Sequence, residues 1–328
     1  MIISHKYRAR GGFRRKGAIM ANETIFKRYE GNPIIKPEDV KNANSVFNSA
    51  VVKFKKGYAG VFRVDTTRMF SELHAGWSDD GINWKIEDKQ IDMKGNTSKN
   101  YKTASCYDPR VVLIDGTYYV TWCYYPAGIS CHIGVAKTKD FKTFYQITEI
   151  MLPYNRNAVL FEGKINGRFA CLNRPSDPFH TSFGEVFYAE SDDLIHWGNH
   201  KFVFGATGGW QRSKVGPGPA PIKIKDGWLM IYHGVRITCS GYIYCMGGAI
   251  LDGKEPWKVK YRARPYLLAP STQYEMVGDV PNVIFPCSIL HDKKSDKVSI
   301  YYGAADTVVG LATADMGELV SWIKKNSD

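Results

Sequence analysis

The stretch YDPRVVLIDGTYYVTW, residues 107–122, contains in one place the features that decide the fold. Two apolar runs flank the pair Asp115-Gly116, and Asp-Gly between such runs is typical of a two-residue β-hairpin turn. Asp108 stands at the open end of this hairpin, away from the turn. One Asp-Pro at a strand entrance is more often a cap than a functional group, so its meaning depends on whether the arrangement recurs.

The arrangement occurs five times along the chain. The apolar runs turn at Lys56-Gly57, Asp115-Gly116, Asn166-Gly167, Asp226-Gly227 and near Ser295-Asp296, about 50 to 70 residues apart. The first four hairpins are followed by a further strand and a polar turn, as in SDDGINW at 78–84 and SDDLIHW at 191–197. Four antiparallel strands in each of five units predict an all-β fold, a five-bladed β-propeller.

The two ends of the chain depart from this repeat. Residues 315–325 have the apolar spacing of a helix and predict a short C-terminal helix. The outer strand that the last unit then lacks is expected from residues 29–35, which would close the ring. We expect residues 1–20 to be a basic N-terminal extension that is disordered or not native, and residues 21–328 to form a single catalytic propeller domain.

Composition limits the classes of function. Half of the net charge of +12 comes from residues 1–19, which contain six basic residues and no acid, so the charge alone does not indicate nucleic-acid binding. No apolar run reaches the roughly 18 to 20 residues that span a bilayer. Seven cysteines without a C-x-x-C pair argue against a disulfide framework or a zinc site. We expect a soluble cytoplasmic protein with no metal and no membrane or nucleic-acid partner, and homo-oligomer formation stays open.

The open ends of the hairpins should share one face of the propeller, because each is opposite its turn. They carry mostly polar residues: Asn48, Arg63, Asp65, Asp108, Arg110, Arg156, Asn157, Arg174, Lys214, His233, Asn282 and Asp306. Cationic side chains suit a phosphate, whereas carboxylates and amides suit sugar hydroxyls. Candidate stacking faces for a sugar are Tyr107, Trp122, Phe183 and Phe285. The mixture predicts a sugar bound beside a phosphate.

Two kinds of bond cleavage fit such a site. An inverting glycosidase needs an acid and a second carboxylate, about 6.5–9.5 Å away, that activates water. An attacking phosphate is already anionic, so cations can replace the base. Hydrolysis is the alternative, with Glu162 or Glu185 as base, although neither lies at a predicted open end. A sugar-binding module without catalysis and a nucleic-acid binder are further alternatives, but neither needs an acid among arginines.

The chain resembles the mannoside phosphorylases of glycoside hydrolase family 130. The motifs that carry the resemblance are VFNSAVV (46–52), YDPRV (107–111), NRN (155–157), NRPSD (173–177), YHGV (232–235), GYIY (241–244), VPNV (280–283) and YYGAADT (301–307). The subgroup most similar to it acts on β-1,4-mannosides, either mannosyl-N-acetylglucosamine or mannooligosaccharides. The resemblance implies a five-bladed propeller, inversion at the anomeric carbon, and α-mannose 1-phosphate as product. Inorganic phosphate is the implied co-substrate, with no cofactor.

The resemblance also implies residue roles. Asp108 is the implied general acid, acting through the mannose 3-hydroxyl. The implied phosphate pocket contains Arg156, Asn157, Arg174, Lys214, His233 and Tyr244. The implied subsite for the transferred mannose contains Asn48, Arg63, Asp65 and Asp306. The implied leaving-sugar side contains Tyr107, His180 and Phe285. The chain departs from the family pattern at FEGK (161–164), SDPFH (176–180) and Pro217. The second departure lies closest to the leaving sugar, whose identity is therefore left open.

Overall fold

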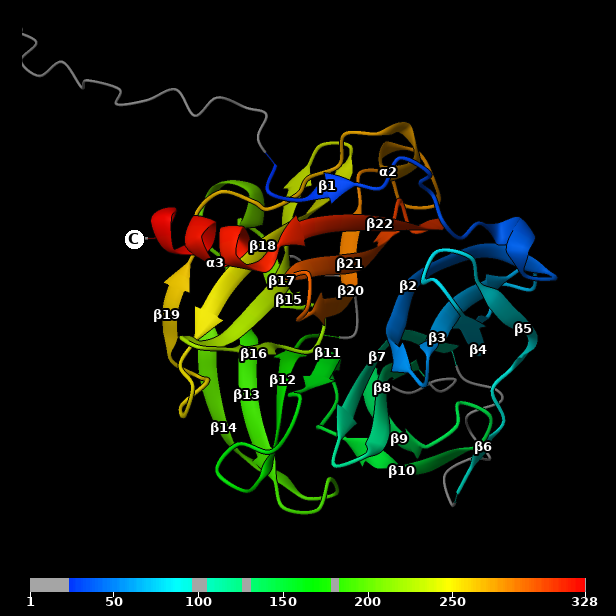
Figure 1. The fold of residues 1–328 in the computed structure, drawn as a ribbon, viewed down its shortest axis with the longest axis horizontal. Coiled ribbons are helices and arrows are strands. Elements are labelled where there is room, and N and C mark those ends of the chain that lie inside the picture. The colour runs from blue at the N-terminus through cyan, green and yellow to red at the C-terminus, as the bar shows by residue number, and fades with distance from the viewer. Residues whose placement is uncertain (1–23, 96–104, 126–130, 178–182, 328) are drawn as a thin grey trace, which may run out of the picture.

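The computed structural model describes residues 24–95, 105–125, 131–177 and 183–327. Five mainly antiparallel sheets are arranged as the blades of a ring, which confirms the predicted five-bladed β-propeller (Figure 1). The expected extension at residues 1–20 lies outside the described residues. No helix in the described part of the chain is long and apolar enough to cross a membrane.

Each blade is built around a long central hairpin. Blade 1 contains β2 (Ala43–Phe54), β3 (Gly57–Thr66), β4 (Ser71–Ser78) and β5 (Lys85–Gln90). Blade 2 contains β7 (Ser105–Ile114), β8 (Thr117–Tyr125), β9 (His132–Thr138) and β10 (Phe144–Ile150), with β6 (Met93–Lys94) parallel to β10. Blade 3 contains β11 (Asn155–Leu160), β12 (Phe169–Pro175), β13 (Val186–Ser191) and β14 (Trp197–Phe204).

The last two blades are less regular. Blade 4 contains β15 (Lys214–Pro217), β16 (Ile222–Ile224), β17 (Gly227–Thr238), β18 (Gly241–Leu251) and β19 (Val259–Arg262), and both β15 and β16 pair with β17. Blade 5 contains β20 (Ile284–Asp292), β21 (Lys297–Ala304), β22 (Val308–Asp315) and β1 (Lys27–Arg28). The short helices are η1 (Pro37–Asp39), η2 (Gly209–Gln211) and α2 (Gln273–Met276). The predicted C-terminal helix is α3 (Met316–Lys325).

One polar turn recurs between the third and fourth strands of the blades. In blade 1 the Asp80 carboxylate accepts hydrogen bonds from the backbone N–H groups of Ile82 and Asn83, both at 2.8 Å. Asp140, Asp193 and Asp252 accept the equivalent pairs in blades 2, 3 and 4. Asp side chains that satisfy the backbone two and three residues ahead stabilise such turns. The repeated aspartates of the sequence are therefore structural, on the outer edge of the ring.

The ring is closed by the N-terminal segment. Strand β1 pairs with β22 through Lys27 opposite Thr313 and Arg28 opposite Ala312, and Ile35 forms a bridge with Val309 (Figure 1). The outer strand of blade 5 thus comes from the predicted end of the chain, a few residues before the expected stretch 29–35. Apolar side chains fill the space between neighbouring blades, and α3 covers the contact of blades 4 and 5 with Leu319 and Ile323.

Candidate active site

Three innermost strands carry the same irregularity at the open end of their blades. The antiparallel register shifts after Phe47 in β2, after Tyr107 in β7 and after Arg156 in β11. Each shift contains a residue with positive φ: Asn48 at 46°, Asp108 at 51° and Asn157 at 58°. Asn and Asp are the side chains that best tolerate this backbone region. Since bulges re-aim side chains next to active sites, these three polar groups turn toward the centre of the ring.

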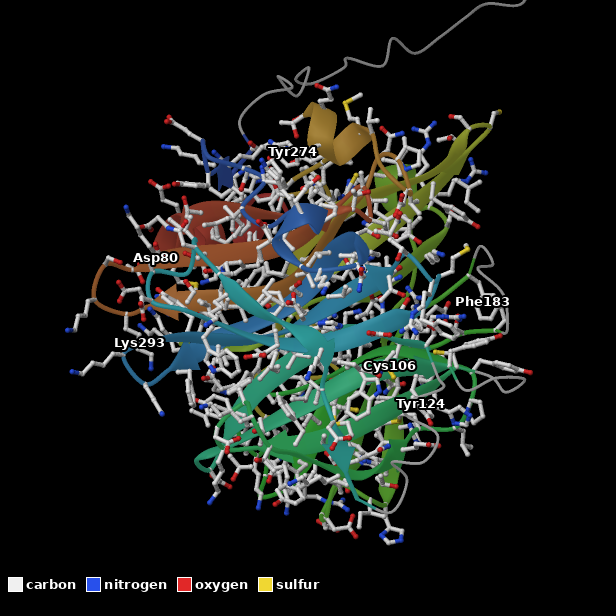
Figure 2. All side chains as sticks on the ribbon, turned by 90° about the vertical axis from the view of Figure 1, so that its right-hand side faces the viewer. Asp80, Cys106, Tyr124, Phe183, Tyr274 and Lys293 are labelled. Atoms are coloured by element: carbon white, nitrogen blue, oxygen red, sulfur yellow. The ribbon has the colours of Figure 1, made fainter. Side chains whose placement is uncertain are left out.

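A cavity of about 640 Å³ lies between these open ends. Its lining comes from all five blades: Asn48, Arg63, Ser71, Ser105, Tyr107, Asp108, Tyr125, Arg156, Asn157, Arg174, Tyr242, Tyr244, Val280, Val283, Phe285 and Asp306. This face of the ring is the one that carries Phe183, whereas Lys293 marks the opposite face (Figure 2). The predicted common face therefore exists and is hollowed.

Asp108 is held by two donors from blade 1. Its Oδ1 accepts a 2.8 Å hydrogen bond from Asn48 Nδ2 and a 2.9 Å bond from Arg63 Nη1. Arg63 also binds Asp65 through both carboxylate oxygens, at 2.9 and 2.8 Å. The Arg63 guanidinium lies 4.1 Å from the ring centre of Phe47. Among the described residues nothing hydrogen-bonds to Oδ2 of Asp108, so that oxygen can serve a ligand.

Two arginines form the cationic side of the cavity. Arg156 and Arg174 are cross-strand partners in blade 3, and both side chains are buried. Arg156 Nη1 donates to Ser176 Oγ and to the carbonyl of Asp177, both at 2.8 Å. Arg174 Nη1 lies 2.8 Å from Nε2 of His233. The Nε groups of both arginines are buried without a hydrogen-bond partner among the described residues, so both retain capacity for an oxyanion.

His233 is hydrogen-bonded to Arg174 and does not line the cavity. The ring is fully buried, and burial together with the charges of Arg174, Arg110 and Lys214 holds its pKa well below 6.5. A neutral imidazole can accept the Arg174 N–H at Nε2, which requires the proton to be on Nδ1. The sequence placed His233 in the phosphate pocket, whereas it does not line the cavity and stands behind Arg174.

Lys214 of blade 4 lies beside the same region and, like His233, is not among the residues that line the cavity. Its ammonium lies 4.8 Å above the ring of Tyr242 and 5.6 Å above that of Tyr244. Burial, and then the charges of Arg174 and Arg156, lower its pKa to about 7. Desolvation and like charge both disfavour the charged amine, so an anion that enters here would restore the proton.

Asp306 closes the cavity from blade 5 and is the second carboxylate of the lining. It lies in the turn between β21 and β22 and has a positive φ of 48°. Burial raises its pKa to about 7, against the attraction of Arg63, and the nearby charges of Asp108 and Asp65 add to the increase. Its electrostatic neighbours therefore belong to the Arg63 side of the cavity, not to the arginine pair of blade 3.

The structure brings together most of the predicted site residues and corrects others. Asp65 reaches the site through Arg63, and His180 lies outside the described residues. Trp122 was wrong as a stacking face, because it is 1% exposed in the core between blades 1 and 2. Phe183 is half-exposed and lies outside the cavity lining. Glu162 lines a different cavity at the opposite face, and Glu185 is exposed outside the site, so neither candidate base is present.

The sequence missed part of the lining. Ser71 begins β4, and Ser105 pairs with Tyr125 at the open end of blade 2. Both serines lie at open ends, by the same rule that identified the charged and amide residues, but they were overlooked. Tyr242 sits beside the hairpin turn of β17 and β18, close to Lys214. The described residues contain no group of three or more metal-binding side chains that could hold an ion.

Comparison with known proteins agrees with this geometry. The family model for β-1,4-mannooligosaccharide phosphorylases of glycoside hydrolase family 130 matches residues 15–325. The chain belongs to glycoside hydrolase family 130. The membership expected from the sequence motifs is therefore confirmed, and the matched region includes every described residue of the cavity.

Two named proteins and one solved structure illustrate what the chain is similar to. The chain is 47% identical to a β-1,4-mannooligosaccharide phosphorylase of Ruminococcus albus, over 92% of each chain. It is 31% identical to a 1,2-β-oligomannan phosphorylase of Thermoanaerobacter, covering 90% of this chain and 98% of that protein. The structure of a β-1,2-mannobiose phosphorylase from Listeria innocua in complex with β-1,2-mannobiose superposes with a TM-score of 0.80 at 25% identity, over 92% and 99% of the two chains.

Proposed function

We propose that this family 130 protein catalyses the inverting phosphorolysis of β-1,4-mannooligosaccharides to α-mannose 1-phosphate and a shortened saccharide. Family membership and the 47% identity to the Ruminococcus albus phosphorylase support the reaction class and the linkage. The same relative favours mannose over N-acetylglucosamine as the leaving sugar. Inorganic phosphate is the co-substrate, and no cofactor is required by this scheme.

One observation carries the proposal: a carboxyl group, Asp108, shares one cavity with the buried arginine pair Arg156 and Arg174. Hydrolysis with inversion needs a carboxylate base on the far side of the sugar from the acid. The other carboxylate in the described lining, Asp306, has Arg63, Asp108, Asp65 and Asp279 as its charged neighbours. It therefore stands on the side of the acid, and the far side is cationic.

In the proposed reaction Asp108 supplies the proton for the departing oxygen, by way of the mannose 3-hydroxyl. Phosphate bound by Arg156, Arg174 and Lys214, with Asn157 and Tyr244, attacks the anomeric carbon from the opposite face. The C–O bond to the leaving sugar breaks as the C–O bond to phosphate forms. Fixed guanidinium groups in a buried site stabilise a phosphate without reorganisation, and His233 keeps Arg174 in place as a neutral acceptor.

The remaining residues are proposed to hold the sugar. Asn48 and Arg63, with Asp65 and Asp306, bind hydroxyls of the transferred mannose. Tyr107 and Phe285 line the leaving-sugar side, and His180 is proposed for the same side. Residues 21–328 are proposed to act as a single catalytic domain in the cytoplasm, where the seven unpaired cysteines would stay reduced. A homo-oligomer is compatible with this scheme.

The test is product analysis of β-1,4-mannotriose cleavage with and without phosphate. We expect α-mannose 1-phosphate and mannobiose with phosphate, and no cleavage without it. Free mannose formed without phosphate, or cleavage in the presence of phosphate that yields no mannose 1-phosphate, would exclude phosphorolysis. Asp108→Asn should lower kcat by about 10²–10⁴-fold, because the amide removes the proton but little volume, while the variant remains folded. An Asp108→Asn variant with the turnover of the wild type would remove Asp108 from the role of acid.

A further inference from the structure

Arg110 is a buried charged residue that the proposed reaction does not use. It is 2% exposed and is one of the largest fully buried side chains of the protein. Its motif places it two residues after Asp108, and the sequence suggested a position at the open end. Instead it does not line the cavity. The side chain lies beneath the cavity, where blades 2, 4 and 5 meet.

The hydrogen bonds of Arg110 go to backbone carbonyls, not to a carboxylate. Nη1 donates to the carbonyls of Asp108 at 3.1 Å and Pro109 at 2.9 Å, and Nε donates to the carbonyl of Gly218 at 2.6 Å. The guanidinium carbon lies 5.4 Å from the ring centre of Phe285. Burying an unpaired cation is costly, so a simple packing role would be served better by an apolar side chain.

These contacts act on the peptide units that orient the acid. Asp108 has a φ of 51° inside a bulge, a conformation that costs an L-residue free energy unless its surroundings fix it. Nη1 of Arg110 donates to the backbone carbonyls of two consecutive residues, Asp108 and Pro109. A second nitrogen anchors this assembly to Gly218 in blade 4, where close approach of the backbone leaves no room for a side chain: a Cβ there would lie 2.7 Å from the Ile231 carbonyl oxygen.

We propose that Arg110 is a positioning residue for proton donation. Its planar guanidinium fixes the left-handed backbone at Asp108 and thereby aims the carboxyl group into the cavity, while it ties the acid-bearing strand of blade 2 to blade 4. Lysine cannot reproduce this role, because a single ammonium has no rigid fork that reaches three carbonyls. The inference rests on the proposed function, in which Asp108 donates the proton.

The test compares substrates that need the proton with substrates that do not. Wild type, Arg110→Met and Arg110→Lys are assayed with phosphate on β-1,4-mannobiose and on 2,4-dinitrophenyl β-mannoside, whose leaving group departs without protonation. We expect Arg110→Met to lower kcat on mannobiose by about 100-fold, the loss typical of a misplacement near 1 Å. On the activated mannoside the loss should be less than about fivefold, and the Kd for phosphate should change by less than about threefold.

Arg168→Met is the matched control, because Arg168 is a partly exposed arginine on the outer edge of blade 3, where it pairs with Asp192 and Glu190 and lies outside the cavity. It should leave both substrates unaffected. Equal losses of Arg110→Met on both mannosides, or a wild-type kcat on mannobiose, would overturn the proposal. If Arg110→Met fails to fold, the same two outcomes are read from Arg110→Lys. A wild-type protein that forms no mannose 1-phosphate from either mannoside would contradict the proposed function instead, so the two failures are distinguishable.

Discussion

Lys214 carries an amine whose charge changes near neutral pH. Burial and the neighbouring arginines lower its pKa to about 7. As pH rises through this value the ammonium loses its proton, so the attraction for phosphate weakens. We expect the KM for phosphate of the wild type to rise by up to about tenfold between pH 6.5 and 8, since each unit of pKa corresponds to a factor of ten in protonation. Steady-state kinetics at varied phosphate concentrations measure this.

The control for that pH dependence is Lys214→Arg. Arginine stays charged throughout the range, so this variant should retain only the pH dependence of the phosphate ion itself. Binding of phosphate to the wild type should also take up protons, which calorimetry in buffers of different ionisation enthalpy detects. Parallel KM profiles for the wild type and Lys214→Arg would show that Lys214 does not titrate at the phosphate site.

The protonation of Asp306 is expected to make the stability of the folded protein depend on pH. Because burial raises its pKa to about 7, the folded protein holds a proton that the unfolded chain releases near its ordinary carboxyl pKa. The free energy of unfolding should therefore decrease as pH rises from about 4 through 7. Asp306→Asn removes this slope, so its stability relative to the wild type should increase between pH 5 and 8, by on the order of a few kcal/mol. Urea unfolding of both proteins at both pH values measures it, and a constant difference would contradict it.

Single residues show where sequence reasoning reached its limit. Asn48, Arg63, Asp108, Arg156 and Arg174 could be predicted because a period-two strand pattern and the turn positions fix which hairpin end they occupy. The direction in which each side chain points could not. Bulges change that direction by one residue, and nothing in the local sequence distinguishes a side chain facing the cavity from one facing the core behind it. His233, Trp122 and Arg110 were placed in or near the cavity for this reason, but His233 and Arg110 lie behind or beneath it and Trp122 lies in the core between blades 1 and 2.

At the scale of elements, the three bulges are what turns an ordinary blade into a binding surface. At Asn157, with φ of 58°, alanine must adopt a backbone that costs roughly 1–2 kcal/mol, whereas glycine adopts it freely. We expect Asn157→Gly to be more stable than Asn157→Ala by up to about 1 kcal/mol, measured by chemical denaturation. Both variants should bind phosphate more weakly than the wild type, since both lose the amide.

The neighbouring residue Ala158 supplies the control. It lies in the same strand β11, is 3% exposed and has no positive φ. Here glycine should be less stable than alanine by about 0.5–1 kcal/mol. The preference between glycine and alanine should thus reverse over one residue. A glycine at position 157 that is less stable than alanine at position 157 would mean that the bulge does not exist in solution.

Most of the hairpins could be predicted from the sequence. The Asp-Gly and Asn-Gly turns fixed the hairpins of blades 2, 3 and 4, because such pairs suit the backbone of a two-residue turn. Blade 4 shows what remained hidden: its innermost strand is split into β15 and β16 around Gly218 and Pro219. Proline has no N–H for the ladder. The interruption creates the free carbonyl of Gly218 to which Arg110 binds, a tertiary contact that no local pattern encodes.

At the scale of the whole molecule, a ring of blades is stable only when its first and last segments meet. Arg28 of β1 binds Glu275 of α2 through two hydrogen bonds, at 2.7 and 2.9 Å. Glu275 is fully buried and also accepts from Tyr302 at 2.9 Å and from the backbone N–H groups of Ser271 and Thr272. The carboxylate therefore connects the N-terminal segment, the blade 4 to blade 5 connection and a strand of blade 5.

Glu275→Gln tests this closure. The amide keeps the shape but leaves Arg28 without its anion, and breaking a buried ion pair costs about 3–5 kcal/mol. Asp226→Asn is the matched control, because Asp226 pairs with Lys324 at 2.7 Å with both side chains more than a third exposed. Exposed pairs are worth about 0–1 kcal/mol. The two variants should therefore differ severalfold in their loss of unfolding free energy, measured by chemical denaturation.

The pH dependence of the same variant separates closure from simple loss of packing. The pKa of Glu275 is lowered, because the hydrogen bonds and charge of Arg28 outweigh the opposing effect of burial. Its contribution to stability is present above the ordinary carboxyl pKa and is lost as pH falls through the lowered value. The wild type and Glu275→Gln should therefore differ most near neutral pH and converge in acid. A difference that stays constant from pH 7 to 3 would mean that the ring does not depend on this ion pair for its closure, and that β1 is held by its strand pairing with β22 alone.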